Sequence, residues 1–462
     1  MAQHENLEGN LSRFVLFRVL YSARFYYPVF TVLFLDYGLT LEQFSILNLI
    51  WALTIVLAEV PSGALADILG RKRLIVFAAL LMVVEMAVLL WVPIGESGFL
   101  FYAFLVNRVC SGLSEAAASG ADEALVYDSL KALGREQEWA SLLERTTRMV
   151  AIGFFSTMVV GALVFDADLV NAVTAWLGLV SGLPPQWIIK APILLTFISA
   201  CLLLLITLGL QEVDLRDRGG VTPTATKGTG LKRLLEPFKQ ILAAADWTLG
   251  HRFVLFVILG TLVLDSVARQ FVVLSSEYYR TIGIPAAWFG VIGAGMSLLG
   301  IVNARVSRYL VSSHSPLFNF FFLAASLMVG LVGLMLAVPF YGVLFAIPAF
   351  AMMGLVSFQS SYYINREVDS SHRATVLSFR GLALNLGLGL ASLLYTFLIA
   401  ALRQNDTAGS AGDAGQTLVF IQSLMAFPVY FALLILGLFA LGTWLVKDRN
   451  PFRTRPGQQA AS

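Results

Sequence analysis

Long apolar runs alternate with short polar segments along the whole chain. A helix needs roughly 20 mainly apolar residues to cross about 30 Å of hydrocarbon, and twelve runs reach that length. The pattern therefore predicts an all-α membrane protein with twelve transmembrane helices. The expected spans are residues 12–36, 41–66, 71–94, 98–127, 139–165, 185–210, 252–279, 285–311, 316–338, 340–364, 374–402 and 417–446.

The middle of the chain interrupts this pattern. Residues 211–251 are rich in charge, glycine and threonine, which predicts a cytoplasmic linker between two six-helix halves, 1–210 and 252–446, followed by a cytoplasmic tail at 447–462. Between Leu231 and Leu242 apolar residues recur at helical spacing, which predicts an amphipathic helix lying on the membrane. Such a helix either restrains the two halves or serves as a passive linker.

A weak internal repeat supports the division into two pseudo-symmetric halves. Ala140-Ser-Leu-Leu leads to Gly153, and Ala374-Thr-Val-Leu leads to Gly387 after the same number of residues. Repeats of this kind build transporters whose site lies near the bilayer midplane between the repeats.

Composition excludes a soluble globular protein. Hydrophobic residues make up 58% of the chain and charged residues 13%, with a mean hydropathy of +0.79, whereas soluble domains are about half apolar and a quarter charged. The net charge of +2 does not suggest nucleic acid as a partner. Cys110 and Cys201 both lie inside apolar spans, so we expect neither a disulfide framework nor a metal site, and no cofactor.

The positions of lysine and arginine predict the orientation, because short cytoplasmic loops carry an excess of these cations. Most of them collect on one side, and the exceptions are Lys190, Arg280 and Arg403. We therefore expect both termini in the cytoplasm and a multi-pass protein of the plasma membrane, the inner membrane of a bacterium. The loop cations that carry this assignment are Arg71, Lys72, Arg73, Lys131, Arg135, Arg366, Arg373, Lys447, Arg449, Arg453 and Arg455.

The segment from Gly63 to Arg73 is the most informative motif. Its sequence is Gly-Ala-Leu-Ala-Asp-Ile-Leu-Gly-Arg-Lys-Arg, between two apolar spans. Gly63 and Gly70 permit close helix approach and a sharp turn, and Asp67 can cap or pair across it. The segment resembles the signature loop of the major facilitator superfamily of transporters, G-x-L-x-D-x-x-G-R-[KR]. This resemblance implies two six-helix halves that rock around a central cavity.

The resemblance also implies a gate. In the superfamily, contacts of this loop latch the halves together on the cytoplasmic side. We expect Asp67 to reach the start of the helix near Ala374 and Arg71 to pair with Asp128. A purely structural role for both contacts is the alternative. The predicted gating residues are Gly63, Asp67, Gly70, Arg71, Asp128 and Arg373.

Ionisable residues inside a membrane span are costly and are functional candidates by default. Arg108, Glu115 and Asp122 recur at steps of seven in span 98–127, which predicts one polar face of a helix. Residues 108–112 are also similar to the R-x-x-Q-G motif of the superfamily's fourth helix, with Ser111 in place of glutamine. The resemblance implies an influence of Arg108 on proton transfer; the alternative is an arginine that only anchors its helix.

Span 12–36 places Arg24 near mid-depth beside Tyr21 and Tyr27, in the helix that lines the cavity in the superfamily. We expect Glu115 to be the acid that meets Arg24 and Arg108, and to be the first choice for a proton carrier.

In the second half, Asp265 and Arg269 have the spacing of an intrahelical ion pair, which either satisfies itself or serves coupling. Gln359 and Tyr362 offer an uncharged polar face to the cavity. Glu59 is expected to pack structurally, and Glu85 needs a partner that the sequence does not identify.

These features predict proton-linked export of small amphipathic compounds, because the first half resembles bacterial drug exporters. The four histidines lie in loops or at helix ends, so carboxylates must carry the protons. The segment 153–161 lacks the proline of the superfamily's antiporter motif, which weakens the case for export. Proton-linked uptake of an anionic metabolite, suggested by Arg24 and Arg108, is the alternative.

A non-transporting receptor or scaffold is a third possibility. An enzyme is not expected, since no nucleophile with a nearby base, metal cluster or phosphate loop is found. We expect the chain to act as a monomer whose partners are a small-molecule substrate, protons and the lipid bilayer.

Overall fold

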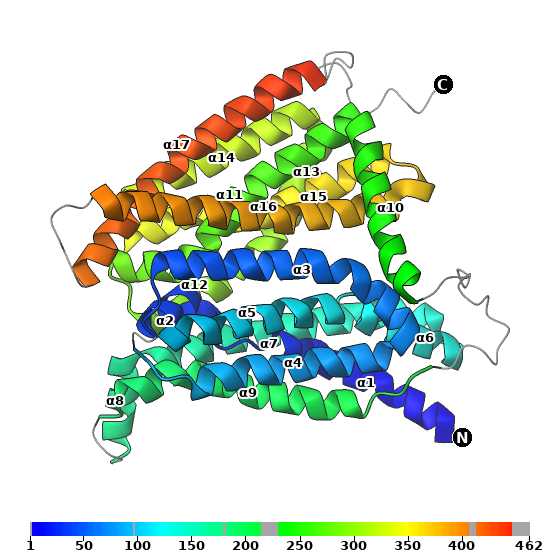
Figure 1. The fold of residues 1–462 in the computed structure, drawn as a ribbon, viewed down its shortest axis with the longest axis horizontal. Helices are drawn as coiled ribbons and strands as arrows, with labels where there is room; N and C mark the ends of the chain where they lie inside the picture. The colour runs from blue at the N-terminus through cyan, green and yellow to red at the C-terminus, as the bar shows by residue number, and fades with distance from the viewer. Residues whose placement is uncertain (1, 96–97, 179–181, 214–229, 406–412, 446–462) are drawn as a thin grey trace.

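The computed structural model describes residues 2–95, 98–178, 182–213, 230–405 and 413–445, which form helices joined by short turns (Figure 1). Among these residues, ten helices are long and apolar enough to cross a membrane. The predicted all-helical, multi-pass architecture is therefore confirmed. Two of the twelve predicted spans, 12–36 and 98–127, are not among the ten, and each is divided by a break.

The helices that precede the linker form a first group on one side of the molecule (Figure 1). They are α1 (Ala2–Ser22), η1 (Tyr27–Val29), α2 (Phe30–Asp36), α3 (Leu41–Leu69), α4 (Arg71–Trp91), α5 (Gly98–Ala118), α6 (Ala121–Leu133), η2 (Glu136–Glu138), α7 (Trp139–Phe165), α8 (Ala167–Trp176) and α9 (Pro185–Leu208).

The helices that follow the linker form a second group beside the first. The linker contributes α10 (Gly230–Gly250), which crosses between the groups at one end of the bundle (Figure 1). We call this the Gly70 end, because Gly70 joins α3 to α4 there, and the opposite end the Asp36 end. The second group comprises α11 (Arg252–Thr281), α12 (Ala286–Ser297), α13 (Leu299–Ser313), α14 (Pro316–Met335), η4 (Tyr341–Ala346), α15 (Ile347–Glu367), α16 (Ser370–Asn405) and α17 (Asp413–Leu445).

The linker helix α10 packs against α3 of the first group and α16 of the second. Its Trp247 ring stacks on His251 with ring centroids 3.5 Å apart, and on His372 at 5.6 Å. Most of the side chains that predicted an amphipathic helix, including those of residues 231–237, lie outside the described ones, as does the predicted tail 447–462.

The first predicted span is not one continuous helix. Helix α1 ends at Ser22, and the chain resumes helical structure only at η1, where Pro28 has no N–H to donate to a preceding carbonyl. The prediction of an uninterrupted span 12–36 is therefore wrong. Arg24 lies within the break, where the Phe25 N–H donates to Thr196 Oγ1 of α9 at 3.0 Å.

The fourth predicted span is divided as well. Helix α5 ends at Ala118, and Gly120 takes the left-handed conformation, with φ of 75°, before α6 begins. Asp122 lies on α6, after this break, whereas Arg108 and Glu115 stay seven residues apart on α5. The prediction that Arg108, Glu115 and Asp122 share one face of one helix is therefore wrong.

The turn of the signature segment is shorter than expected. Helix α3 continues to Leu69 and α4 starts at Arg71, so that Gly70 alone makes the turn, with φ of 94° and ψ of 146°. This conformation favours glycine. Gly63 lies inside α3, and a Cβ added there would meet no atom of the described residues within 4 Å. Its predicted role in close helix approach is thus not seen.

The most extensive contacts between the groups are those of α3 with α16 and of α7 with α12, and α2 also packs against α11. Gly290 of α12 lies so close to the Met158 carbonyl that a Cβ would collide with it, and a Cβ on Gly389 would be 3.2 Å from Leu49. The glycines of the internal repeat occupy related places: a Cβ on Gly153 would be 2.9 Å from Val19 of α1, and one on Gly387 3.2 Å from Leu262 of α11.

Ion pairs also join the groups at the Asp36 end. Arg280 lies 2.6 Å from Asp36, and Arg403 lies 2.8 Å from Glu42. Lys190 donates to the carbonyl oxygens of Leu90 and Val92 at 2.8 Å each. Each of the three cations that were exceptions to the expected charge distribution therefore has a specific partner.

Candidate functional site

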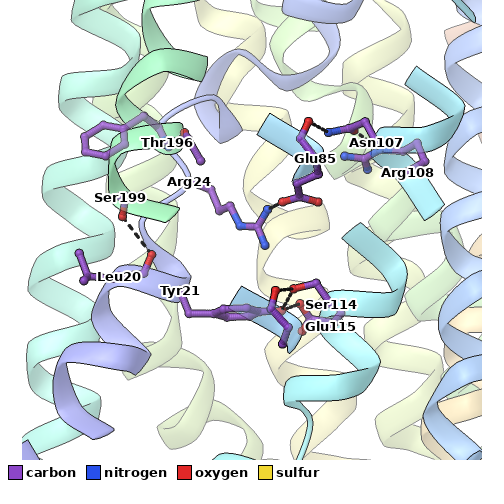
Figure 2. A network of polar contacts seen from close by, with 12 residues as sticks. Leu20, Tyr21, Arg24, Glu85, Asn107, Arg108, Ser114, Glu115, Thr196 and Ser199 are labelled. Carbon is purple, nitrogen blue, oxygen red and sulfur yellow. Dashed lines mark hydrogen bonds and ion pairs between the residues drawn. The ribbon is translucent and has the colours of Figure 1, made fainter. Parts of the chain in front are cut away.

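A buried ion pair lies at the centre of the first group. Arg24, in the break after α1, pairs with Glu85 of α4, and their side chains are 3% and 0% exposed. Figure 2 shows the guanidinium pointing at the Glu85 carboxylate, above the ring of Tyr21. The expected partner of Arg24 was Glu115, so that prediction is wrong. The partner of Arg24 is Glu85, the acid for which the sequence identified no partner.

Arg108 of α5 lies beside this pair without a carboxylate at ion-pair distance among the described residues. Its Nε donates to Asn107 Oδ1 at 3.2 Å, and its guanidinium lies over the rings of Phe30 and Phe34 at 5.1 and 5.3 Å. Asn107 in turn donates to the Glu85 backbone oxygen at 3.0 Å. Aromatic faces stabilise a cation away from water, and they replace the predicted contact with Glu115.

Glu115 belongs to a second polar cluster, about two turns further along α5 than Arg108 (Figure 2). The Tyr21 hydroxyl lies 3.1 Å from Ser114 Oγ and 3.4 Å from Glu115 Oε2. The Glu115 side chain is exposed and lies within electrostatic range of Glu59 on α3. In the described part of the chain, neither carboxylate has a cation at ion-pair distance. Glu59 was expected to be only structural.

Asp122 is held apart from Glu115. It is nearly fully buried at the start of α6, where its Oδ2 lies 3.0 Å from Arg18 Nη1 and its Oδ1 accepts from the Glu123 N–H at 2.8 Å. Arg18 also reaches Glu123 at 3.3 Å. Asp122 is therefore an anchor between α1 and α6 in this structure.

Tyr27 and Tyr26 differ sharply in exposure. Tyr27 is 44% exposed, whereas Tyr26 is 1% exposed, with their ring centroids 5.2 Å apart. An exposed aromatic ring at the break of the first span offers a surface on which a ligand can pack.

The second group contains a polar cluster with more positive than negative charge. Asp265 forms the intrahelical ion pair with Arg269 at 2.6 Å, and Arg269 Nη1 donates to Asn385 Oδ1 at 3.3 Å. Arg380 lies within electrostatic range of the same Asp265 and donates to Ser360 Oγ at 2.8 Å. One carboxylate therefore serves two guanidinium groups, contributed by α11 and α16.

Arg380 and Asn385 were missed in the sequence. Arg380 lies inside the predicted span 374–402, so the rule that singled out Arg108 also applied to it. Asn385 carried no signal, because a single amide in a helix has many structural uses.

Gln359 and Tyr362 lie on α15. Gln359 is completely buried, and within the described part of the chain neither its Nε2 nor its Oε1 has a hydrogen-bond partner. Tyr362 is 37% exposed, with its ring against Tyr363. A buried amide without partners is costly, which makes Gln359 a group that a ligand or water would satisfy.

The gating residues lie at the Gly70 end. Arg71 forms an ion pair with Asp128 and donates to the Ala124 carbonyl at 2.8 Å. Arg373 donates to the Val368 carbonyl at 3.1 Å. The side chains of Asp67 and Ala374 lie outside the described ones, so the predicted contact between them is not tested.

Glu212, which follows α9, was not predicted as part of this region. Its two oxygens accept from the backbone N–H groups of Arg71 at 3.1 Å and Lys72 at 2.8 Å, and so cap the start of α4. The sequence signal for Glu212 was the position of a carboxylate directly after the last span of the first half. Glu212 attaches the beginning of the linker to the signature turn.

Comparison with known proteins gives a consistent result. The family model described as Major Facilitator Superfamily matches residues 14–392. The nucleoside transporter NupG is similar in structure, with 12% identity, a TM-score of 0.67, and coverage of 94% of this chain and 98% of NupG. No curated protein sequence matches.

Two further solved structures resemble the chain. A bacterial homolog of the human lysosomal transporter Spinster, inward-facing and unoccupied, has 16% identity and a TM-score of 0.65, with coverage of 96% of this chain and 98% of that one. A D-xylose–proton symporter has 12% identity and a TM-score of 0.59, with coverage of 95% and 97%. At these identities the likeness establishes the fold alone.

Proposed function

Because this chain belongs to the Major Facilitator Superfamily and is a transporter rather than an enzyme, we propose that it moves a small anionic molecule across the membrane by proton-coupled alternating access. The observation that carries this proposal is the excess of partly or fully buried cations over carboxylates. Among the described residues, Asp265 is the one carboxylate near Arg269 and Arg380. Arg24 and Arg108 likewise share Glu85, which forms its ion pair with Arg24 and leaves Arg108 with an amide and two aromatic rings as its direct contacts.

A cation held away from water needs a counter-charge, because its lost hydration costs several kcal/mol by typical estimates. An anionic substrate supplies that charge when it binds. Ser360 and Asn385 add hydrogen-bonding groups beside the two arginines of the second group. The runner-up suggested by the sequence, an anionic substrate, therefore becomes the leading proposal.

Export of small amphipathic compounds, the first expectation from the sequence, is the second candidate. The exposed Tyr27 ring favours it, together with the aromatic residues packed around it. This second candidate includes membership of a drug-exporter-like subgroup and transport in the outward direction.

Glu115 and Glu59 are the proposed proton-coupling pair. Glu115 is exposed, Glu59 lies within its electrostatic range, and neither carboxylate has a cation at ion-pair distance among the described residues. The Tyr21 hydroxyl donates to Glu115 and links the pair to the cluster around Arg24. Asp122 and Asp265 are then positioning residues, since each has its own ion pair, and Arg108 belongs to the proposed anion site.

The two helix groups are the proposed moving halves, with twelve passes when the two broken spans are counted. Residues 1–210 and 252–446 rock against each other, and the linker 211–251 connects them. We propose that the Gly70 end is cytoplasmic, that both termini lie there, and that the chain works as a monomer in a bacterial inner membrane. The Arg71 and Asp128 pair supports the signature turn during this motion.

Flux measurements in vesicles test the proposal. Purified protein reconstituted with an imposed pH gradient should accumulate compounds from a panel of organic anions, and Arg380→Gln should abolish this accumulation. Arg308→Gln, which removes an exposed arginine of α13, is the matched control and should leave it intact. If only neutral or cationic amphipathic compounds move, and Arg380→Gln leaves their flux unchanged, the anion proposal is wrong and the second candidate stands.

A further inference from the structure

A polar pocket lies at the Gly70 end, away from the site described above. It encloses about 420 Å³ between α1, the end of α6 and the start of α7. Its walls combine three leucines with six polar or charged residues. The lining residues are Glu8, Leu11, Ser12, Leu130, Arg135, Glu138, Ser141, Leu142 and Arg145.

The pocket is lined by two acidic and two basic side chains, but not all of them are fully paired with one another. Arg135 is held by both Glu138 oxygens at 2.6 and 2.7 Å and by Glu8 Oε1 at 3.0 Å. Arg145 is exposed and has no partner among the described residues. The second Glu8 oxygen likewise has no partner among the described residues, and the side chain is 59% exposed. One cationic and one anionic group thus remain available in the same pocket.

A small cluster of aromatic rings lies beside the pocket. Trp139 begins α7 next to Glu138, and its ring contacts Phe14 at 6.4 Å and Tyr127 at 5.5 Å. Tryptophan and tyrosine gather at the depth of lipid headgroups. The three leucines supply an apolar part of the lining, as the upper part of an acyl chain requires.

We propose that this pocket binds the headgroup of a zwitterionic phospholipid, with the phosphate on Arg145 and Ser12 and a primary ammonium on Glu8. Arginine matches phosphate oxygens well, and a carboxylate accepts hydrogen bonds from an ammonium. A purely anionic headgroup fits less well, because Glu8 and Glu138 would repel it. A quaternary ammonium has no N–H to donate to Glu8.

Native mass spectrometry of the full-length protein in detergent tests this proposal. Phosphatidylethanolamine, phosphatidylglycerol and phosphatidylcholine with identical acyl chains are titrated separately, and free phosphoethanolamine serves as the soluble probe. The wild type should bind phosphatidylethanolamine most tightly. Arg145→Gln should weaken this binding about tenfold, the loss expected for one charge-assisted hydrogen-bonding group.

Two further variants sharpen the test. Glu8→Gln should remove the preference for ethanolamine over choline, while Arg135 keeps its contact with Glu138. Arg148→Gln is the matched control, since Arg148 is exposed on the same helix but does not line the pocket, and it should bind as the wild type does. All three side chains are exposed or partly so, and equal thermal unfolding midpoints would show that the variants fold.

Three outcomes would overturn the proposal. Equal binding of all three lipids by the wild type would indicate a non-selective lipid shell. Unchanged binding in Arg145→Gln would place the headgroup elsewhere. Free phosphoethanolamine binding as tightly as the lipid would make the ligand a soluble phosphate ester rather than a membrane lipid.

Discussion

Arg24, in the break after α1, forms an ion pair with Glu85 of α4 in which both side chains are almost completely buried. The pair ties an irregular segment of backbone to a regular helix. Glu85→Gln would leave the Arg24 guanidinium buried without a counter-charge, so we expect a loss of about 3–5 kcal/mol in the free energy of unfolding. Unfolding of the purified protein in detergent, followed by circular dichroism, measures this loss.

The double variant Arg24→Leu with Glu85→Leu is the control for that experiment. Replacing both charges by apolar groups removes the unpaired ion, and stability should return to near the wild-type value. A double variant as unstable as Glu85→Gln would show that the pair contributes through its geometry and not through charge balance.

The proposed coupling pair predicts a separation of two activities. Glu115→Gln cannot release a proton, so accumulation driven by a pH gradient should fall at least about tenfold, the scale of a lost proton-transfer group. Exchange of substrate at equal pH on both sides needs no net proton movement and should persist. Both are measured in the same vesicles, once a transported anion is known.

Glu59→Gln should produce a weaker form of the same defect, since Glu115 keeps its own proton site. Glu144→Gln, an exposed acid on α7, should have no effect on either activity. Loss of exchange together with accumulation in Glu115→Gln would assign Glu115 to substrate binding instead of coupling.

The two glycines of the signature segment should respond oppositely to alanine. At Gly70, φ of 94° strains any other residue, and the added Cβ would lie 2.9 Å from Glu212 Oε2. Gly70→Ala should therefore cost about 1–3 kcal/mol of unfolding free energy. At Gly63, inside α3 with open space around it, alanine should stabilise by about 0.5–1 kcal/mol. Unfolding midpoints of the two variants give the comparison, and a destabilised Gly63→Ala would point to a contact formed in another state.

The ion pair of Asp36 with Arg280 joins the two groups at the Asp36 end. Asp36→Asn removes this pair and leaves the 2.6 Å contact of Arg280 with Glu277. The opening of this end should become more frequent by up to about fivefold, because partly exposed pairs contribute about 1 kcal/mol or less. Maleimide labelling of Thr31→Cys, a fully buried position that contacts Ser276, reports that opening when Cys110 and Cys201 are replaced by serine.

Asp168→Asn is the matched control for that measurement, because Asp168 is an exposed acid of α8 near the same end. It should leave the labelling rate unchanged. An Asp36→Asn variant that labels no faster than this control would show that hydrophobic packing alone holds the end closed.

The sequence predicted local relationships well. The turn near Gly70 and the spacing of Asp265 and Arg269 depend only on neighbours along the chain, and both relationships are present. The sequence also predicted that Arg24 and Arg108 lie at a similar level. Arg24 pairs with Glu85, and Arg108 contacts Asn107, which donates to the Glu85 backbone. Depth does not fix the direction in which a side chain points around its helix, and for that reason Glu115 was chosen as the partner of Arg24 in place of Glu85.

Breaks in helices account for most of the other errors. The few residues around Gly120 are mildly polar, and they give no strong signal that a helix ends there. Because α5 ends before Gly120, Asp122 lies at the start of α6, where it pairs with Arg18. Arg380 was accessible to the same reasoning as Arg108, and Glu212 was marked by its place directly after a span, whereas Asn385 depends on a tertiary contact that no local pattern encodes.

The ion pairs that hold the Asp36 end differ in setting from the pair at the centre of the first group. Arg280 and Arg403 are 41% and 36% exposed, so dissolved salt screens their attraction for Asp36 and Glu42. Arg24 and Glu85 are shielded from such screening. The ionic strength of one compartment therefore enters the balance between the carrier's conformations, while the architecture of each half stays indifferent to it.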